Sequence, residues 1–302
     1  MTTSHRYSKT RTTFGLWQLI QLAPALLVVV GLFGGALALA LLQSLGFAPW
    51  FGINEFPNPN YFLALWSEPD FWRSLWLTLY YGLASTVVGL VISVPLALTF
   101  ERRFRGSKTL LALTRLPLMI PYTVGIALAL LMLGNGGILS RLAAGLGLIT
   151  DPGEFPRVLQ THWGWGVIAV YVWKQVPFMT LALLAVLMGI GQGTREAARI
   201  LGASQVQVFW RITLPQLMPG VVSASLICFA FNVGAFEAPF ILGGGHPETL
   251  PVLAWRYFND ANYTYQLQGM AVIVSLILVS GSILVGYLAI VRRFERVRGK
   301  AP

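Results

Sequence analysis

Long apolar runs without charged side chains dominate this sequence and leave few folds open to it. Each run exceeds the roughly 20 residues that an α-helix needs to cross a bilayer. Inside a bilayer the backbone must satisfy its own hydrogen bonds, which a helix does within one segment. Only 11% of the residues are charged, against about 25% in soluble domains. The chain is therefore predicted to be an all-α, polytopic membrane protein.

Six transmembrane helices are predicted, one for each run. Four runs carry no charge, and two carry a single internal one, Lys174 in the fourth and Glu237 in the fifth. The first run is about twice as long as the ~7–15 apolar residues of a cleaved signal peptide, so we expect a retained span. The predicted helices cover residues 17–45, 74–100, 116–138, 163–190, 217–242 and 268–291.

The placement of basic residues predicts the orientation. Most of the 21 Lys and Arg residues lie in segments 1–15, 101–115, 194–215 and 292–302, whereas the alternate loops hold most of the acidic residues. By the positive-inside rule these four segments, and both termini with them, are cytoplasmic. Because the basic residues form short clusters beside the spans, the net charge of +10 indicates topology, and no nucleic-acid partner is expected.

The chain divides into four parts by composition. Residues 1–15 are polar, basic and rich in Ser and Thr, and are expected to be a disordered tail, and residues 16–72 hold the first transmembrane helix and a periplasmic loop. Residues 73–291 form a five-helix core that contains the polar loop 194–215, and residues 292–302 form a basic cytoplasmic tail. No loop reaches the about 50 residues that a separate folded domain requires.

The loop 194–215 is a polar island between the fourth and fifth spans. Its first part, Arg195–Leu201, is predicted to be a short helix with small apolar residues on one face, and Gly202 permits a sharp bend after it. A second helix is expected over Gln205–Thr213, closed by Pro215. Taken alone, this pattern fits a rigid protrusion that binds another protein, and it also fits an amphipathic helix that rests on the lipid surface.

The spacing in this loop resembles the signature loop of the permease subunits of ATP-binding-cassette (ABC) importers, by which such permeases hold their ATPase. One helix followed by a five-helix core is also similar to type I importers of this kind. The resemblance implies a multi-pass protein of the bacterial inner (cytoplasmic) membrane. The residues that carry it, and that it assigns to ATPase coupling, are Glu196, Ala197, Ala198, Gly202, Ile212, Leu214 and Pro215.

The same resemblance implies a set of partners. These are a pair of ATP-binding-cassette ATPase subunits, a second permease subunit, expected to be a paralogue, and a periplasmic or lipid-anchored substrate-binding protein. A phosphate-binding loop needs Gly-x-x-x-x-Gly-Lys-[Ser/Thr], and the nearest stretches, 106–109 and 299–301, lack its glycine spacing or its hydroxyl. We therefore expect no enzymatic activity and no cofactor in this chain, with ATP bound by the partner subunit.

Five polar residues within the predicted spans are candidates for the substrate path. A charge at mid-bilayer costs about 2.5–3.5 kcal/mol on insertion scales, so it should face protein or water. The alternatives are an ion pair between the two charged candidates or snorkelling of their side chains toward the outer interface, and interhelical hydrogen bonds made by the neutral candidates. No metal site and no catalytic cluster is predicted. The candidates are Lys174, Glu237, Asn232, Gln175 and Tyr122.

The cargo is predicted only from a looser resemblance. The stretches 116–121 and 234–244 resemble the polyamine-type (spermidine/putrescine) branch of these permeases. An acidic path residue would suit such a cationic solute. Importers of sugar, ferric iron, sulfate, phosphonate or thiamine share the loop and stay open as alternatives. A secondary transporter is a further alternative, which would show paired broken helices and would not need the loop.

Overall fold

The structure, a computed structural model, describes residues 16–102, 104–190 and 193–298. Six helices within these residues are long and apolar enough to cross a membrane, which confirms the six predicted spans. The tail predicted at residues 1–15 lies outside the described residues. The six helices are Ile20–Ser44, Pro69–Glu101, Tyr122–Gly145, Trp165–Gly189, Gln205–Gly234 and Tyr263–Ala289.

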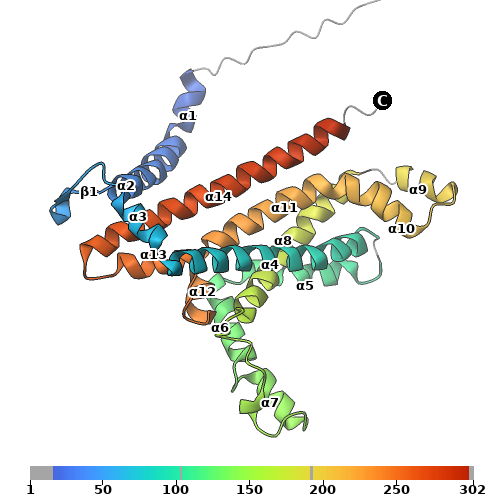
Figure 1. The fold of residues 1–302 in the computed structure, drawn as a ribbon. Helices are drawn as coiled ribbons and strands as arrows, with labels where there is room; N and C mark the ends of the chain where they lie inside the picture. The colour runs from blue at the N-terminus through green and yellow to red at the C-terminus, as the bar shows by residue number, and fades with distance from the viewer. Residues whose placement is uncertain (1–15, 103, 191–192, 299–302) are drawn as a thin grey trace, which may run out of the picture.

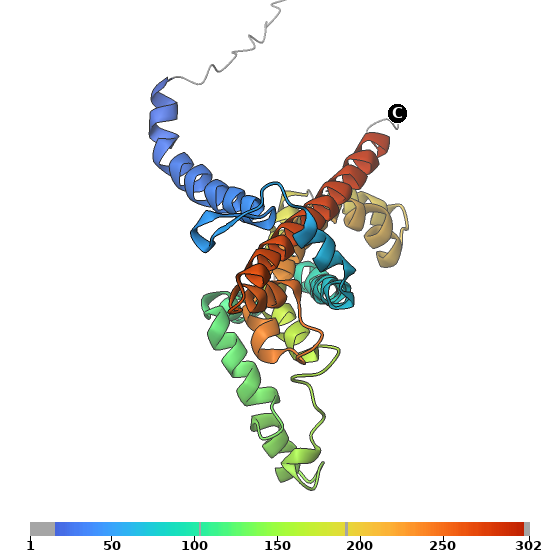
Figure 2. The same cartoon turned by 60° about the vertical axis from the view of Figure 1, so that its left-hand side comes forward.

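The first span stands at the edge of the bundle. It is one continuous helix composed of α1 (Leu16–Leu26), the π-helical stretch η1 (Leu27–Gly34) and α2 (Gly35–Ser44). It packs through α2 against α14 (Tyr263–Arg298), which extends the sixth span into the predicted C-terminal tail. Toward its N-terminus the helix leans away from the bundle (Figures 1 and 2). Most of its large apolar side chains are exposed, as expected of a helix that faces lipid.

A short hairpin follows the first span, and the sequence pattern does not predict it. β1 (Phe47–Ala48) pairs antiparallel with β2 (Ile53–Asn54) around the 3-10 turn η2 (Pro49–Phe51), and α3 (Asn60–Ser67) leads to the second span. Within the described residues this hairpin is the one departure from the predicted all-α fold. Its buried side chains share an apolar cluster with α13 (Leu250–Phe258) and the start of α14.

Three helices form the centre of the bundle: α4 (Pro69–Glu101), α8 (Trp165–Gly189) and α11 (Leu214–Gly234). α4 contacts both α8 and α11 (Figure 1). Small residues at the crossing allow the close approach that is common between membrane helices. A Cβ atom at Gly82 of α4, for example, would lie 2.8 Å from Cγ2 of Val233 in α11.

The third predicted span is interrupted. α5 (Ser107–Met119) ends before Pro121 and α6 (Tyr122–Leu133) begins directly after it, so the prediction of one helix over 116–138 is wrong at this point. Proline has no N–H and disfavours helical backbone in the residue that precedes it. Ile120 is accordingly extended, with φ −79° and ψ 129°.

Beyond this break the chain forms an arm that projects from the bundle (Figures 1 and 2). The arm consists of α6, α7 (Ile138–Gly145) and the 3-10 turn η3 (Pro152–Glu154) before the chain returns to α8.

The fifth predicted span differs from the structure at both ends. α10 (Gln205–Val208) and the π-helical turn η4 (Phe209–Thr213) run into α11 without a break. Pro215 therefore lies inside one continuous helix, at the turn where η4 passes into α11, and it does not close the preceding helix as predicted. At the other end the helix stops at Gly234, and α12 (Glu237–Leu242) is a separate short helix, so a continuous helix over 217–242 is also wrong.

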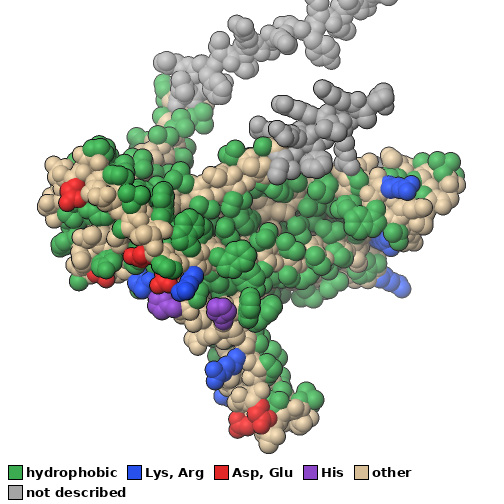
Figure 3. Space-filling model, viewed as in Figure 1, with side chains coloured by type: hydrophobic (Ala, Val, Ile, Leu, Met, Phe, Trp, Pro, Cys, Tyr) green, Lys and Arg blue, Asp and Glu red, His purple; other side chains and the backbone are tan. Residues whose placement is uncertain are grey.

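Charged side chains gather toward the ends of the bundle, with a wide apolar belt between them. In Figure 3 the right-hand end, near α5, α9 (Gly193–Ile200) and α10, shows only Lys and Arg among its charged side chains. Acidic side chains appear at the left-hand end and at the tip of the arm. This distribution agrees with the predicted orientation, in which segments 101–115 and 194–215 face the cytoplasm.

Replacing Gly82 with leucine should loosen the contact between α4 and α11. The added side chain would overlap Val233 and Phe229, and overpacking of this kind costs about 1–3 kcal/mol. We expect a lower thermal unfolding midpoint in detergent, measured by intrinsic fluorescence. Gly286→Leu is the control, because nothing lies within 4 Å of a Cβ atom at that position. An equal fall in both variants would contradict the close packing at Gly82.

Candidate functional site

The loop between the fourth and fifth spans forms a two-helix protrusion at the inward end of the bundle. α9 and α10 are joined by a tight bend at Gly202, whose φ of +84° favours glycine. Ser204 and Gln207 then cap α10 with a reciprocal pair of hydrogen bonds. The predicted helix, bend and second helix are thus all present, and the caps give the protrusion a fixed shape.

The seven residues that the family resemblance assigns to coupling fall into two groups. Those on the protrusion are mostly exposed: Glu196, Ala197, Ala198 and Gly202. Those at its root are half-buried where the helix enters the bundle: Ile212, Leu214 and Pro215. At the tip, the neighbouring side chains of Ile200 and Leu201 are 86% and 87% exposed. The tip therefore carries two neighbouring aliphatic side chains that no other part of the described chain covers.

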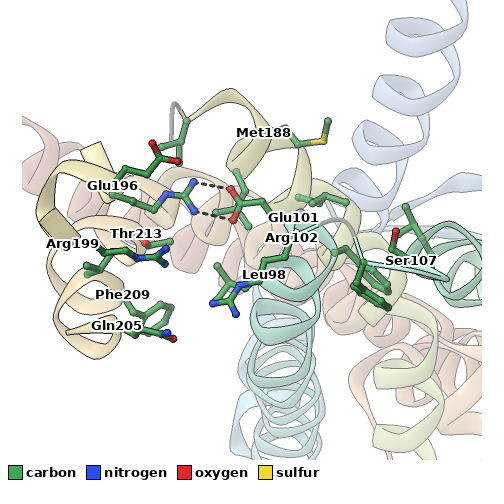
Figure 4. A pocket seen from close by; sticks show the side chains of 18 of the residues that line it. Leu98, Glu101, Arg102, Ser107, Met188, Glu196, Arg199, Gln205, Phe209 and Thr213 are labelled. Atoms are coloured by element: carbon green, nitrogen blue, oxygen red, sulfur yellow. Dashed lines mark hydrogen bonds and ion pairs between the residues drawn. The ribbon is translucent and has the colours of Figure 1, made fainter. Parts of the chain in front are cut away.

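An ion pair ties this protrusion to the second span. The two terminal guanidinium nitrogens of Arg195, in α9, each lie 2.8 Å from a carboxylate oxygen of Glu101, the last residue of α4 (Figure 4). The two side chains are only 12% and 10% exposed, so the pair is largely shielded from water. Bidentate geometry and low exposure make this contact stronger than an ordinary surface ion pair.

Glu101 is a functional candidate that the sequence analysis missed. It is the single acidic residue in the basic inward segment 101–115. That isolation among lysines and arginines is the signal by which it could have been found.

A cleft separates the protrusion from the inward ends of α4 and α5. Its volume is about 1730 Å³, and Arg195 and Glu101 are among its lining residues (Figure 4). Further basic side chains, Arg102, Lys108 and Arg199, also line it. The ion pair therefore connects the protrusion to the inward end of α4 across this cleft.

A buried polar cluster joins the three central helices. Asn232 Nδ2 of α11 donates hydrogen bonds to Ser85 Oγ of α4 and to Gln175 Oε1 of α8, each at 2.9 Å. Gln175 Nε2 donates in turn to the backbone carbonyl of Ser85. Two of the candidate path residues, Asn232 and Gln175, therefore hydrogen-bond between helices, as one of the open alternatives foresees.

Lys174 supplies hydrogen bonds that the break between α5 and α6 leaves unmade. Its Nζ donates to the carbonyl oxygens of Pro117, at 2.6 Å, and Ile120, at 2.7 Å. In a continuous helix the carbonyl of Pro117 would accept from the N–H of residue 121, but that residue is a proline. The ammonium also lies at the C-terminal end of α5, where the helix dipole favours a cation.

Most of the path candidates surround one small cavity. It has a volume of about 230 Å³ between α5, α6, α8 and α11, and its surface is mostly apolar. Four of the five candidates line it: Tyr122, Lys174, Gln175 and Asn232. The hydroxyl of Tyr122 is buried without a protein partner. The structure thus brings together most of the residues that the sequence singled out.

Glu237 lies close enough to Tyr122 to interact with it electrostatically, but its position differs from that of the other four candidates. It is exposed at the first position of α12, and it is not among the residues that line the cavity. The expected alternative of an ion pair with Lys174 is not found, because Lys174 binds the two carbonyls instead. Within the described part of the chain, no group of three or more potential ligands could hold a metal ion.

The outward end of the bundle carries a second polar link. The hydroxyl of Tyr257, in α13, donates to Glu68 Oε2 at 2.8 Å, just before α4 begins. Burial, and then the hydrogen bond to this carboxylate, raises the pKa of Tyr257, so the hydroxyl keeps its proton to a higher pH than an ordinary tyrosine does.

Comparison with known proteins finds relatives over most of the bundle. Residues 89–296 match the family described as "Binding-protein-dependent transport system inner membrane component". The molybdenum transport system permease protein ModB of Mycobacterium bovis is 30% identical over 73% of this chain and 81% of its own length. The trehalose/maltose transport system permease protein MalF of Thermococcus litoralis is 28% identical over 78% of this chain and 79% of its own.

A solved structure is similar in fold. It is a bacterial alginate ABC transporter in complex with an alginate pentasaccharide-bound periplasmic protein. The match has a TM-score of 0.74 at 21% sequence identity and covers 92% of this chain and 93% of the other.

Replacing Lys174 with methionine should destabilise the junction of α5 and α6. The change leaves the carbonyl groups of Pro117 and Ile120 without their donor, and each unsatisfied buried group costs about 1–3 kcal/mol. We expect a lower yield of folded protein and a lower thermal midpoint in detergent, measured by fluorescence-detected size-exclusion chromatography.

Two further variants make this test specific. Lys174→Arg keeps the charge and the donors and should retain most of the stability. Pro121→Ala restores an N–H that can reach Pro117, so it should recover part of the loss when combined with Lys174→Met. A fully stable Lys174→Met variant would contradict the role of Lys174 at the break.

Proposed function

The chain belongs to the family of binding-protein-dependent transport system inner membrane components, and we propose that its loop 194–215 holds the ATPase that drives import. As the permease subunit of an ABC importer it crosses the inner membrane several times, and ATP hydrolysis is left to a separate subunit. In this proposal the chain forms part of the translocation path for a small hydrophilic solute that a binding protein delivers.

The exposed tip of the protrusion is the observation that supports this role of the loop best. Ile200 and Leu201 present large apolar side chains to water, with the exposed Glu196 nearby on the same helix. In the proposed assembly an ATPase subunit covers this surface, and a pair of ATPase subunits serves the two permease subunits. A helix that merely rests on lipid is disfavoured, because α9 extends past the ends of the spans (Figure 1) and is held to α4 through Arg195.

A second permease subunit, which we propose to be a paralogue, completes the path. α6 packs against α8 and α12 on one side only. Its other side exposes Val124, Leu130 and Leu131, which a partner helix or lipid must cover. At the opposite end, the outward loops are proposed to receive a substrate-binding protein, as the alginate transporter of similar fold binds a periplasmic protein.

The class of cargo is a proposal of its own. The relatives reported above are named for molybdenum and for trehalose or maltose. These names support an oxyanion or a sugar, and they give no support to the polyamine expected from the looser sequence resemblance. We therefore propose a small oxyanion or sugar as the cargo.

A cationic polyamine is retained as a second candidate because of Glu237. Its carboxylate is exposed at the start of α12, and the ion pairs found among the described residues do not include it. A carboxylate near the path attracts cations and repels oxyanions, so this one residue favours a cargo of positive charge.

Changes in the loop should release the ATPase. Gly202→Val places a β-branched residue at a φ of +84°, which strains the bend by about 1–3 kcal/mol, and Glu196→Ala removes the exposed carboxylate of α9. We expect either variant to lose ATP-dependent uptake and to retain much less ATPase during purification.

The control for this experiment is Gly106→Val. Gly106 has a similar φ of +86° in the other inward loop, so the variant carries comparable backbone strain outside the signature loop. It should keep its ATPase. Normal ATPase binding and uptake in both loop variants would contradict the proposed role of the loop.

Glu237→Gln separates the classes of cargo. Removing the charge should lower uptake of a polyamine several-fold, leave sugar uptake unchanged, and leave or raise oxyanion uptake. The measurement is uptake of labelled spermidine, maltose and molybdate by vesicles that contain the complete transporter. Glu154→Gln, an exposed carboxylate on the arm, is the control and should change none of the three. Spermidine uptake that is unaffected by Glu237→Gln would remove the argument for a polyamine.

A further inference from the structure

The contact between α9 and the membrane-spanning core depends on one pair of side chains. Among the described residues, the only hydrogen bonds from an α9 side chain to the spans are the two that Arg195 donates to Glu101. The other close neighbours of α9 are α10 and η4, which belong to the same protrusion or its root. Movement of α9 therefore reaches α4 most directly through this pair.

The surroundings of the pair leave room for such movement. The cleft of about 1730 Å³ lies between the protrusion and the inward ends of α4 and α5. Figure 4 draws the two hydrogen bonds that Glu101 accepts as dashed lines, and it shows Arg199 and Gln205 further along the protrusion. Two bodies separated by a cleft and joined by a bidentate pair can shift together, because the pair resists both separation and sliding.

Glu101 is also the end of a rigid element that leads to the cavity. α4 is a single helix of 33 residues from Pro69 to Glu101. Near its middle lies Ser85, the residue to which both Asn232 and Gln175 donate. Since Asn232 and Gln175 line the small cavity, a displacement of the inward end of α4 is passed to the wall of that cavity.

We propose that the Arg195–Glu101 ion pair is the positioning contact that transmits ATPase-driven movement of α9 to α4, and through α4 to the cavity. The inference rests on the proposed role of the loop in holding the ATPase. It adds a residue outside the loop, Glu101, and assigns to Arg195 a partner within the permease.

The fold of each part does not depend on the pair. The inward end of α4 is already packed in an apolar cluster with α8 and α11, to which Ala97, Phe100 and Leu217 belong. The protrusion is anchored separately at its root, where Val208 and Thr213 are buried. The pair therefore links two elements that are each held in place by other contacts.

The test uses the complete transporter in lipid vesicles with its binding protein. Four quantities are measured: ATPase retained with the permease, basal ATP hydrolysis, its stimulation by the loaded binding protein, and solute taken up per ATP hydrolysed. For Glu101→Gln and Arg195→Gln we expect normal ATPase retention. Stimulation and uptake per ATP should fall about tenfold, because each change removes the bidentate link between α9 and α4.

The double variant Glu101→Arg with Arg195→Glu exchanges the positions of the two opposite charges. Because the two side chains still attract each other, it should recover much of the stimulation of ATP hydrolysis. Asp70→Asn is the matched control, because it breaks the exposed Arg73–Asp70 pair at the outer end of α4 and should change nothing. Unchanged stimulation in both single variants, or no recovery in the exchanged pair, would overturn the inference. Loss of ATPase from the single variants would also overturn the inference. If instead the loop does not hold the ATPase at all, Glu196→Ala and Gly202→Val will retain normal ATPase binding, which detects that failure separately.

Discussion

Backbone hydrogen bonding inside the membrane is the constraint on which the rest of this structure depends. Where a helix breaks within the bilayer, the protein must supply partners for the backbone groups that the break frees. At the break between α5 and α6, Lys174 donates to two such carbonyls. Lys174 is only partly buried, and its two hydrogen bonds offset part of the cost of breaking the helix, which gives a physical reason for a charge inside an apolar span.

The spans could be predicted from the sequence, but their breaks could be predicted only in part. The length and neutrality of each run are enough to predict a membrane helix, and all six are present. The breaks at 120–121 and 235–236 depend on Pro121 and Pro239, each of which leaves the carbonyl four residues earlier without its helical donor. Other prolines, such as Pro177, lie within continuous helices, so proline alone does not mark a break.

The candidate site was predictable to different degrees. The assignment of Glu196, Gly202 and their neighbours to coupling rests on a family resemblance within one loop, and it stays a prediction. Four path candidates gather at one cavity, although the sequence could not show that Asn232 and Gln175 bond to Ser85. Arg195 and Glu101 are 94 residues apart, and their pairing depends on how three spans pack. Contacts of that kind require tertiary structure.

The central claim is that the tip of the protrusion is covered by a separate ATPase subunit. The chain has one cysteine, the buried Cys228. A Cys228→Ser variant therefore has no thiol, and a single cysteine can be introduced into it at a chosen position. With Ile200→Cys at the tip, a short bifunctional maleimide should cross-link the permease to a cysteine-bearing ATPase in membranes, and Val285→Cys, exposed on α14, should not. No cross-link from position 200, or equal cross-linking from both positions, would contradict the account.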